Sequence, residues 1–184
     1  MILGKSYLGS TEIEKIYLGS NVVYEAGGGG VDVFPQDNAA SLSDLASIGS
    51  WVVGTPGTPT LSVGTSGSYD GTNHIISTST STSSQASQIS VPITIGQSYN
   101  ITLYAQLIAT DPLKEVKVSL LGGTFTQFEY VFPRVGVTGT WVELTYDFVA
   151  YSATGTLVVY PNFFWGTNTT GDQILIDKVT ITEI

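Results

Sequence analysis

The sequence predicts an all-β protein, an antiparallel β-sandwich preceded by a small N-terminal module. Three observations support this prediction. Short segments with alternating polar and apolar residues follow one another beyond residue 60, and glycine-containing turns separate many of them. Charged residues are only 11% of the chain, while aromatic and β-branched residues, which favour strands, are plentiful. Residues 44–50 have room for one helical turn, and no longer stretch shows helical periodicity.

The expected strands of the sandwich can be placed in order along the chain. Alternation is cleanest at 98–105, where polar and apolar side chains take strict turns. The full set is 61–63, 74–77, 88–91, 98–105, 115–120, 126–131, 141–149, 155–160 and 173–181. Short strands at this spacing predict a sandwich or barrel. The Ser/Thr-rich tract 77–88 is expected to form exposed strand ends around a loop; the alternative is a strand pair with a hydroxyl-covered face.

The first 24 residues contain a repeat with a period of ten. The segment Lys5-Ser-Tyr-Leu-Gly-Ser returns as Lys15-Ile-Tyr-Leu-Gly-Ser. Each unit is too short to bury a core, so it must pack against another copy, the rest of the chain or a partner. We expect two or three short strands whose edges add to another protein's sheet. The residues expected to dock are Tyr7, Leu8, Gly9, Tyr17, Leu18, Gly19, Val22 and Val23. The alternative is a hairpin that folds back on its own sandwich.

A run of four glycines divides the chain. Consecutive glycines have the largest backbone freedom of any sequence, so 27–30 is expected to act as a linker. The predicted organisation is therefore an anchoring module at 1–26, the linker at 27–30 and a sandwich domain at 31–184.

Composition excludes several classes of partner. The net charge of −9 argues against nucleic acid, which requires basic surfaces, and against anionic membrane surfaces. No apolar run approaches the roughly 20 residues of a membrane span. The first residues lack the pattern of a signal peptide, so we expect no export through that route. The chain has no cysteine, which removes disulfides, thiolate metal sites and cysteine nucleophiles.

Catalytic chemistry has little support in the sequence, and we expect no enzyme. His74 is the only histidine and lies in an apolar strand, which favours a structural role over a general base. A glycosidase needs two carboxylates facing each other across a cleft. Asp70, Glu129, Glu143 and Asp147 are candidates only by elimination. Glu143 and Asp147 share one face of a strand, and that face is expected to be solvated.

Four motifs, in this order, give the domain a resemblance to the jelly-roll carbohydrate-binding modules, the galactose-binding-like sandwiches. They are 71–77 (Gly-Thr-Asn-His-Ile-Ile-Ser), 91–99 (Val-Pro-Ile-Thr-Ile-Gly-Gln-Ser-Tyr), 138–148 (with Trp141 and Phe148) and 174–181 (Ile-Leu-Ile-Asp-Lys-Val-Thr-Ile). The resemblance spans about 51–184 and implies a jelly-roll fold. It says less about function, because domains with this fold bind many things or nothing.

The same resemblance implies a metal site. In those modules an aspartate of the closing strand often helps to hold a structural calcium ion, and Asp177 occupies the matching position. Asp32, Asp37 or Asp44 would supply a ligand from the start of the domain, since calcium takes six to eight oxygen ligands. The competing interpretation is that Asp177 pairs with neighbouring residues or faces water. No cofactor is required.

The densest aromatic cluster lies between the last two expected strands. A sugar ring stacks on aromatic faces while polar groups bind its hydroxyls. The candidate glycan-binding residues here are Phe163, Phe164, Trp165 and Asn168. Aromatics are also enriched at subunit interfaces and in cores, and we favour those roles over glycan binding for this cluster. Trp141 is expected in the core.

The N-terminal repeat resembles the short Lys-x-Tyr-Leu-Gly-Ser units at the start of many tailed-bacteriophage virion proteins. That resemblance covers about 2–25 and implies a module that docks a fibre or decoration onto the particle. The expected protein is a virion component made in the host cytoplasm and located on the virion surface. Its expected partners are capsid, portal or tail proteins, further copies of itself and, through the sandwich, glycans of host or mucus. The alternative is a carbohydrate-binding module of a secreted or cell-surface glycan-utilising system.

Overall fold

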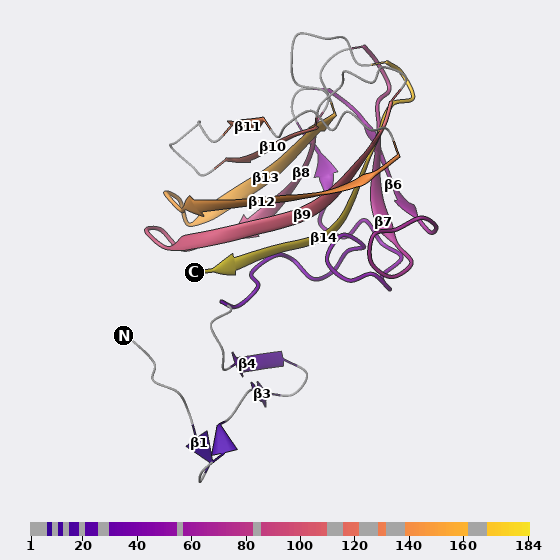
Figure 1. Ribbon diagram of the computed structural model, residues 1–184. Coiled ribbons are helices and arrows are strands. Elements are labelled where there is room, and N and C mark those ends of the chain that lie inside the picture. Colours follow the sequence, from indigo (N-terminus) through magenta and orange to yellow (C-terminus); the bar gives the residue numbers. More distant parts are fainter. Residues whose placement is uncertain are drawn as a thin grey trace.

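The computed structural model describes most of the sandwich and four short strands before it (Figure 1). The residues it describes are 7–8, 11–12, 15–18, 21–25, 30–54, 57–82, 86–109, 116–121, 129–131, 139–161 and 169–184. For the strands before Gly30, for 129–131 and for most of 116–121, the description covers backbone pairing only. These residues contain strands, turns and bends but no helix, and so none of them forms a helix able to cross a membrane.

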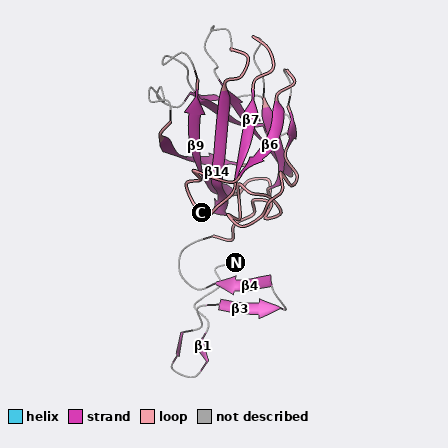
Figure 2. Cartoon of the chain, turned by 90° about the vertical axis from the view of Figure 1, so that its right-hand side faces the viewer, coloured by secondary structure: helices cyan, strands magenta, loops and turns pink. Residues whose placement is uncertain are grey.

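Two five-stranded antiparallel sheets form the sandwich. The first, sheet I, has the order β12-β9-β14-β7-β6. Its strands are β12 (Trp141–Val149), β9 (Ser98–Ile108), β14 (Gln173–Glu183), β7 (His74–Thr78) and β6 (Thr60–Gly64). Figure 2 shows β9, β14, β7 and β6 side by side in this sheet.

Sheet II packs against sheet I and has the order β11-β10-β13-β8-β5; in Figure 1 it lies above sheet I. Its strands are β11 (Glu129–Val131), β10 (Val116–Leu121), β13 (Thr154–Pro161), β8 (Ser87–Pro92) and β5 (Val52–Val53). The chain passes between the sheets repeatedly, for example from β8 in sheet II to β9 in sheet I. The predicted all-β antiparallel sandwich is confirmed.

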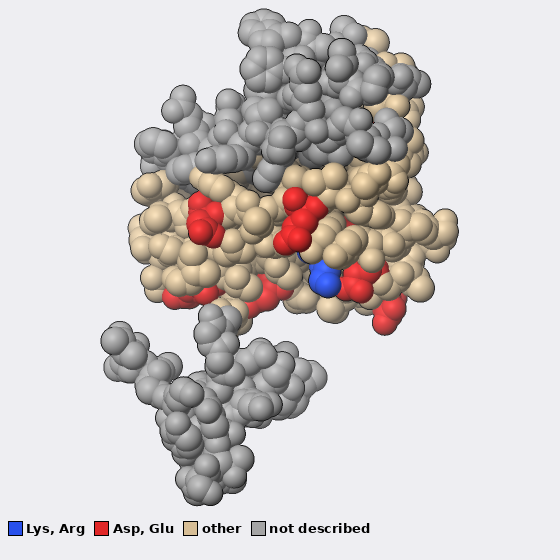
Figure 3. Space-filling view, viewed as in Figure 1, with Lys and Arg blue, Asp and Glu red and all other residues tan. Residues whose placement is uncertain are grey.

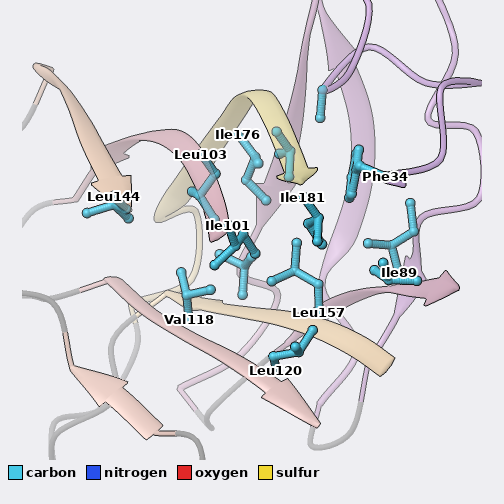
Figure 4. Packing of buried hydrophobic residues seen from close by; sticks show 14 of the residues in the cluster. Phe34, Ile89, Ile101, Leu103, Val118, Leu120, Leu144, Leu157, Ile176 and Ile181 are labelled. Atoms are coloured by element: carbon cyan, nitrogen blue, oxygen red, sulfur yellow. The ribbon is translucent and has the colours of Figure 1, made fainter. Parts of the chain in front are cut away.

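The core fills the space between the two sheets (Figure 4). Along β9 every second side chain points inward, and all five are at least 96% buried; they are Tyr99, Ile101, Leu103, Ala105 and Leu107. Leu157 of β13 and Ile89 of β8 face them from sheet II and are fully buried. Each such aliphatic side chain contributes about 1.5–3 kcal/mol when it leaves water. The alternation predicted for 98–105 is confirmed, and it leaves the other side of β9 as the outer face of sheet I.

The start of the domain is joined to its last strand. Asp32 forms an antiparallel bridge with Thr182 of β14, and the Val33 N–H donates to the Ile181 carbonyl at 2.8 Å. One carboxylate oxygen of Asp32 accepts from the backbone N–H groups of Phe34 and Ile181. Burial raises the pKa of Asp32, and these hydrogen bonds oppose the rise.

Short antiparallel pairs occur within each copy of the N-terminal repeat. They are β1 (Tyr7–Leu8) with β2 (Thr11–Glu12), and β3 (Lys15–Leu18) with β4 (Asn21–Glu25). Gly9, Gly19 and residues 26–29 lie outside the described residues. The anchoring module and its docking role therefore stay predictions.

Candidate functional site

A loop crosses the outer face of sheet I from one edge to the other. Residues 65–73 connect β6 to β7 at one edge of the sheet, yet the indole Nε1–H of Trp141, on β12 at the opposite edge, donates to the Gly67 carbonyl at 2.9 Å. At its other end the loop meets Ser43, whose carbonyl accepts the Asn73 N–H at 2.9 Å. Gly71 has a φ of +62° and lies so close to Ser43 that a Cβ would overlap it. The loop is therefore held at both ends.

Three aromatic side chains meet beneath and within this loop. The ring of Tyr69 stacks on Tyr104 of β9, with 3.6 Å between centroids and 11° between planes. Trp141 meets Tyr69 edge-on at 6.4 Å, and the ring of His74 meets Trp141 edge-on at 5.7 Å. Tyr69 is 44% exposed despite these contacts. We call Tyr69, Tyr104 and Trp141 the aromatic platform.

An irregularity in β14 places two charged residues against the loop. The register of β14 with β9 shifts between Asp177 and Thr180, and Lys178 within it has a φ of +48°, a conformation rare outside glycine and asparagine. Asp177 is 1% exposed. One of its carboxylate oxygens accepts the N–H groups of Tyr69 and Asp70, at 2.8 and 3.0 Å, and the other accepts that of Lys178 at 2.8 Å. A single carboxylate thus fixes the middle of the loop.

The side chain of Lys178 lies beside the platform. Its ammonium nitrogen is 3.5 Å from an Asp70 carboxylate oxygen and 5.7 Å from the centroid of the Tyr69 ring, within the range of a cation–π contact. Both partners of the ion pair are about half exposed, so it contributes little to stability. It brings the charged ends of Lys178 and Asp70 together beside the Tyr69 ring.

Tyr104 connects the platform to an acidic side chain. Glu143 of β12 lies directly opposite Tyr104 in the strand pairing. Hydrogen bonding to Tyr69 raises the pKa of Tyr104, and burial and the hydrogen bond and charge of Glu143 raise it further. The phenol is therefore protonated at neutral pH, and the exposed Glu143 carboxylate acts as an acceptor.

A hydrogen-bonded ladder of small polar side chains continues the same face along β9 and β12. The Asn100 amide donates to Asp147 at 2.6 Å and to Thr145 at 3.2 Å, and the Thr102 hydroxyl lies 3.0 Å from that of Thr145. Thr145 and Asp147 are exposed. The prediction that Glu143 and Asp147 share a solvated face is confirmed.

His74 lies on the same face but is closed off from solvent. It is 1% exposed, its Nδ1 lies 2.9 Å from the Ser68 hydroxyl, and its ring rests on Gly64 of the neighbouring strand. Burial lowers the pKa of His74, so the ring is neutral at physiological pH. This placement agrees with the predicted structural role, since the ring supports Trp141 and the loop.

The site differs from the one that the sequence indicated. Phe163, Phe164, Trp165 and Asn168 lie outside the described residues, so their glycan or interface role stays a prediction. The docking residues Tyr7, Leu8, Tyr17, Leu18, Val22 and Val23 lie in the short N-terminal strands, and their side chains are not described.

Trp141 is not a core residue, so the core prediction was wrong. Its indole lies half-buried on the outer face, because it shares the strand parity of Glu143 and Thr145. The shared position of Trp141 and Glu143 on one face of the strand was the feature of the sequence that could have indicated the platform. The stretch Ser68-Tyr69-Asp70 carries no motif that would place it over the sheet.

The described residues supply no further ligands for the calcium ion predicted at Asp177. Among them, no three acidic or histidine side chains lie close enough together to hold a metal ion. Both Asp177 oxygens accept backbone N–H groups instead. Asp37 accepts the Ser50 hydroxyl, and Asp32 is bound to the far end of β14. The calcium ion therefore stays a prediction.

Comparisons with known proteins place the fold and leave the family open. No protein-family model matches the chain, and no curated protein does either. Among solved structures, the CBM22-1 xylan-binding domain of Paenibacillus barcinonensis Xyn10C is similar with a TM-score of 0.63 and 18% identity, over 86% of this chain and 98% of that domain. TmCBM61 in complex with β-1,4-galactotriose is similar with a TM-score of 0.53 and 12% identity, over 84% of this chain and 99% of that module.

A phage protein is also similar. The enzymatically active domain of tailspike protein 4 of bacteriophage CBA120 has a TM-score of 0.61 and 12% identity, over 83% of this chain. The match spans about a fifth of that protein's length, 21%. At these identities the likenesses show the fold alone, a jelly-roll β-sandwich. Since binding modules and an enzyme domain both share it, the fold does not choose an activity.

Proposed function

We propose that the protein is a display protein whose jelly-roll domain binds glycans through the outer face of sheet I. The observation that carries the proposal is the aromatic platform, in which the partly exposed ring of Tyr69 is fixed against Tyr104 and Trp141. A pyranose presents an apolar face of C–H groups that suits such rings. The similarity to a xylan-binding domain and to a galactotriose-bound module supports this proposal.

The polar side chains beside the platform would bind the hydroxyls of a sugar chain. The exposed carboxylates of Glu143 and Asp147 accept hydrogen bonds, while Asn100, Thr102 and Thr145 both donate and accept. They lie in register across β9 and β12, so they form a strip that continues from the platform. A strip of this kind suits an extended oligosaccharide.

The proposed binding site can be tested with a matched set of tyrosine and tryptophan variants. Binding of the full chain to a glycan array, followed by calorimetry on the glycans retained, would be compared for Tyr69→Ala, Trp141→Ala and Tyr151→Ala. Tyr151 is 50% exposed in the turn between β12 and β13, away from the platform, and serves as the control. We expect the first two variants to lose about tenfold or more in affinity and the control to bind as the parent does. An array that retains nothing with the parent chain would overturn the proposal.

We further propose that the protein is a virion component held by its N-terminal module. The repeat of 1–26 and its resemblance to phage virion proteins support this role, and so does the similarity of the domain to a tailspike. Its partners would then be capsid, portal or tail proteins and further copies of itself, with the sandwich on the virion surface.

The second candidate is a carbohydrate-binding module of a secreted or cell-surface glycan-utilising system. The observation that favours it is the extent of the match, since the chain covers 98 and 99% of two binding modules but 21% of the tailspike.

Particle binding separates the two candidates. The full chain and a chain without 1–26 would be mixed with phage particles and sedimented, after thermal unfolding has shown that both are folded. The virion proposal expects the full chain to sediment with the particles and the shortened chain to remain in solution. Equal sedimentation, or none with either chain, would favour the second candidate.

A further inference from the structure

Carboxylates surround the aromatic platform. Glu143 is exposed and pairs with Tyr104, Asp147 is exposed at the other end of the polar ladder, and Asp70 is adjacent to Tyr69 in the loop. Figure 3 shows acidic side chains spread over this side of the domain, with a single basic side chain among them. The described residues around the proposed site are therefore mainly acidic.

Among the residues whose side chains are described, little positive charge is available to offset these carboxylates. Lys178 is the only lysine or arginine among the residues whose side chains are described, and its ammonium group is already 3.5 Å from Asp70. Glu143 and Asp147 have no such partner among those residues, since their neighbours are the phenol of Tyr104 and the amide of Asn100. The chain as a whole carries a net charge of −9, so the wider field has the same sign.

We infer that this face selects uncharged glycans and rejects those that carry carboxylate groups. The inference rests on the proposed glycan site and adds the chemical class of its ligand. A neutral sugar supplies hydroxyl hydrogens to the carboxylates, which is a favourable pairing. A uronic or sialic acid in the same place brings a like charge next to Glu143 or Asp147, and such repulsion is an effective way to discriminate between ligands of similar shape.

The repulsion has a recognisable dependence on salt. Exposed charges interact over about 10 Å at 0.1 M ionic strength and only about 3 Å at 1 M. Stacking on the platform is not an interaction between charges and changes much less. Discrimination against acidic glycans is therefore expected to be largest in dilute buffer and to shrink as salt is added.

The experiment compares polymers that differ only in charge. Glucuronic-acid-bearing xylan, polygalacturonate and hyaluronan would each be used before and after carboxyl reduction, which turns each carboxylate into a hydroxymethyl group and keeps the backbone. Affinity electrophoresis of the full chain gives the ratio of the two affinities for every backbone that binds. We expect the reduced form to bind at least about tenfold more tightly, with a ratio nearer to one at about 1 M salt.

Variants assign the effect to the named residues. The double variant Glu143→Gln/Asp147→Asn removes two charges and keeps one acceptor oxygen on each side chain, and we expect it to lower the ratio several-fold. Asp44→Asn/Asp37→Asn changes the net charge equally in the 36–50 segment and is expected to leave the ratio as it is.

The outcomes separate the two levels of the proposal. Acidic forms that bind as tightly as the reduced forms, or an unchanged ratio in the double variant, would overturn the inference and leave the glycan site standing. Absence of binding to every polymer here and to every glycan of the array would overturn the glycan site, and the inference with it.

Discussion

The rings of Tyr69 and Tyr104 lie face to face at 3.6 Å, although one belongs to a loop and the other to the middle of a strand. This contact joins the loop 65–73 to the outer face of sheet I. It also links the aromatic rings to a carboxylate, because the Tyr104 hydroxyl is hydrogen-bonded to the Glu143 side chain. The stack is therefore the place where the apolar and polar parts of the proposed site meet.

Removing the Tyr104 hydroxyl alone is expected to leave the ring stack in place and to remove the hydrogen bonds at its polar end. Tyr104→Phe keeps the ring and deletes the hydrogen bonds to Tyr69 and Glu143, so chemical denaturation should show a small loss of stability. A spectroscopic pH titration provides a second readout. The parent should contain a tyrosine with a pKa above the ordinary value of 10.0, and the variant should lack that step. Identical titrations would contradict the assignment.

Among the residues that attach the loop 65–73 to the sheet, Asp177 is expected to cost the most stability when it is substituted. Asp177→Ala leaves the partly buried N–H groups of Tyr69, Asp70 and Lys178 without their acceptor, and an unsatisfied buried group costs about 1–3 kcal/mol. We expect chemical denaturation to show a loss of about 2–4 kcal/mol, with weaker glycan binding because Tyr69 is released. Asp44→Ala, an exposed aspartate outside the site, is the matched control and should change stability by less than about 0.5 kcal/mol.

Calcium removal tests the other role predicted for Asp177. Its two oxygens already accept three backbone N–H groups, so we expect the thermal midpoint to be the same in a chelator and in excess calcium. A midpoint that rises with calcium in the parent, but not in Asp177→Ala, would show that this carboxylate holds the ion after all.

Gly64 and His74 are expected to be coupled. A methyl group at position 64 would overlap the imidazole ring, so Gly64→Ala should destabilise the domain by about 1–3 kcal/mol. His74→Ala opens the space that the methyl group needs. A double-mutant cycle should therefore give an interaction energy of about 1–3 kcal/mol, with the double variant more stable than the sum of the single effects predicts. Simple additivity would mean that the ring does not lie on Gly64.

His74 also predicts how stability changes in mild acid. Burial lowers its pKa below 6.5 in the folded state, so below pH 6.5 the unfolded chain takes up a proton that the folded chain does not. The contribution of neutral His74 to the free energy of unfolding is therefore complete above pH 6.5. It is lost as the pH falls towards the folded-state pKa.

Denaturation of the parent and of His74→Gln across this range isolates the effect. Asp32 and Asp177, whose pKa values are raised by burial, contribute with the opposite sign at pH values above 3.8, but equally in both proteins. The difference between parent and variant should therefore grow in the parent's favour as the pH rises to 6.5. Parallel curves would contradict the prediction.

The sandwich could be predicted because the alternation of polar and apolar residues along a strand shows which side chains are buried and which are exposed. Alternation along 98–105 separates Tyr99 and Ile101 from Asn100 and Thr102, and the structure confirms that division. The same rule placed Glu143 outside, and applied consistently it would have placed Trp141 there too. Its size and aromatic character favoured the core instead, although an indole has an N–H that requires a partner.

The loop could not be predicted, because no local pattern specifies it. Its position depends on Lys178 adopting a left-handed backbone in a bulge, and on Asp177 reaching residues far away in the sequence. The resemblance offered Asp177 as a calcium ligand, with pairing to neighbouring residues or exposure to water as the alternatives. Which backbone N–H groups the carboxylate binds could be seen only in the three-dimensional structure, because those of Tyr69 and Asp70 lie far away in the sequence.

The Asp32–Thr182 bridge has a mechanical consequence. The chain enters the domain beside the last residues of β14, and the bulge of that same strand holds the loop that carries Tyr69. If the molecule is tethered through its N-terminus and pulled by a ligand on the outer face, the tension runs along β14. Between the bulge and Thr182 that strand is paired with β9, whereas its pairing with β7 is confined to Gln173–Ile176. The load path is therefore short, because it covers only the part of β14 from Asp177 to Thr182.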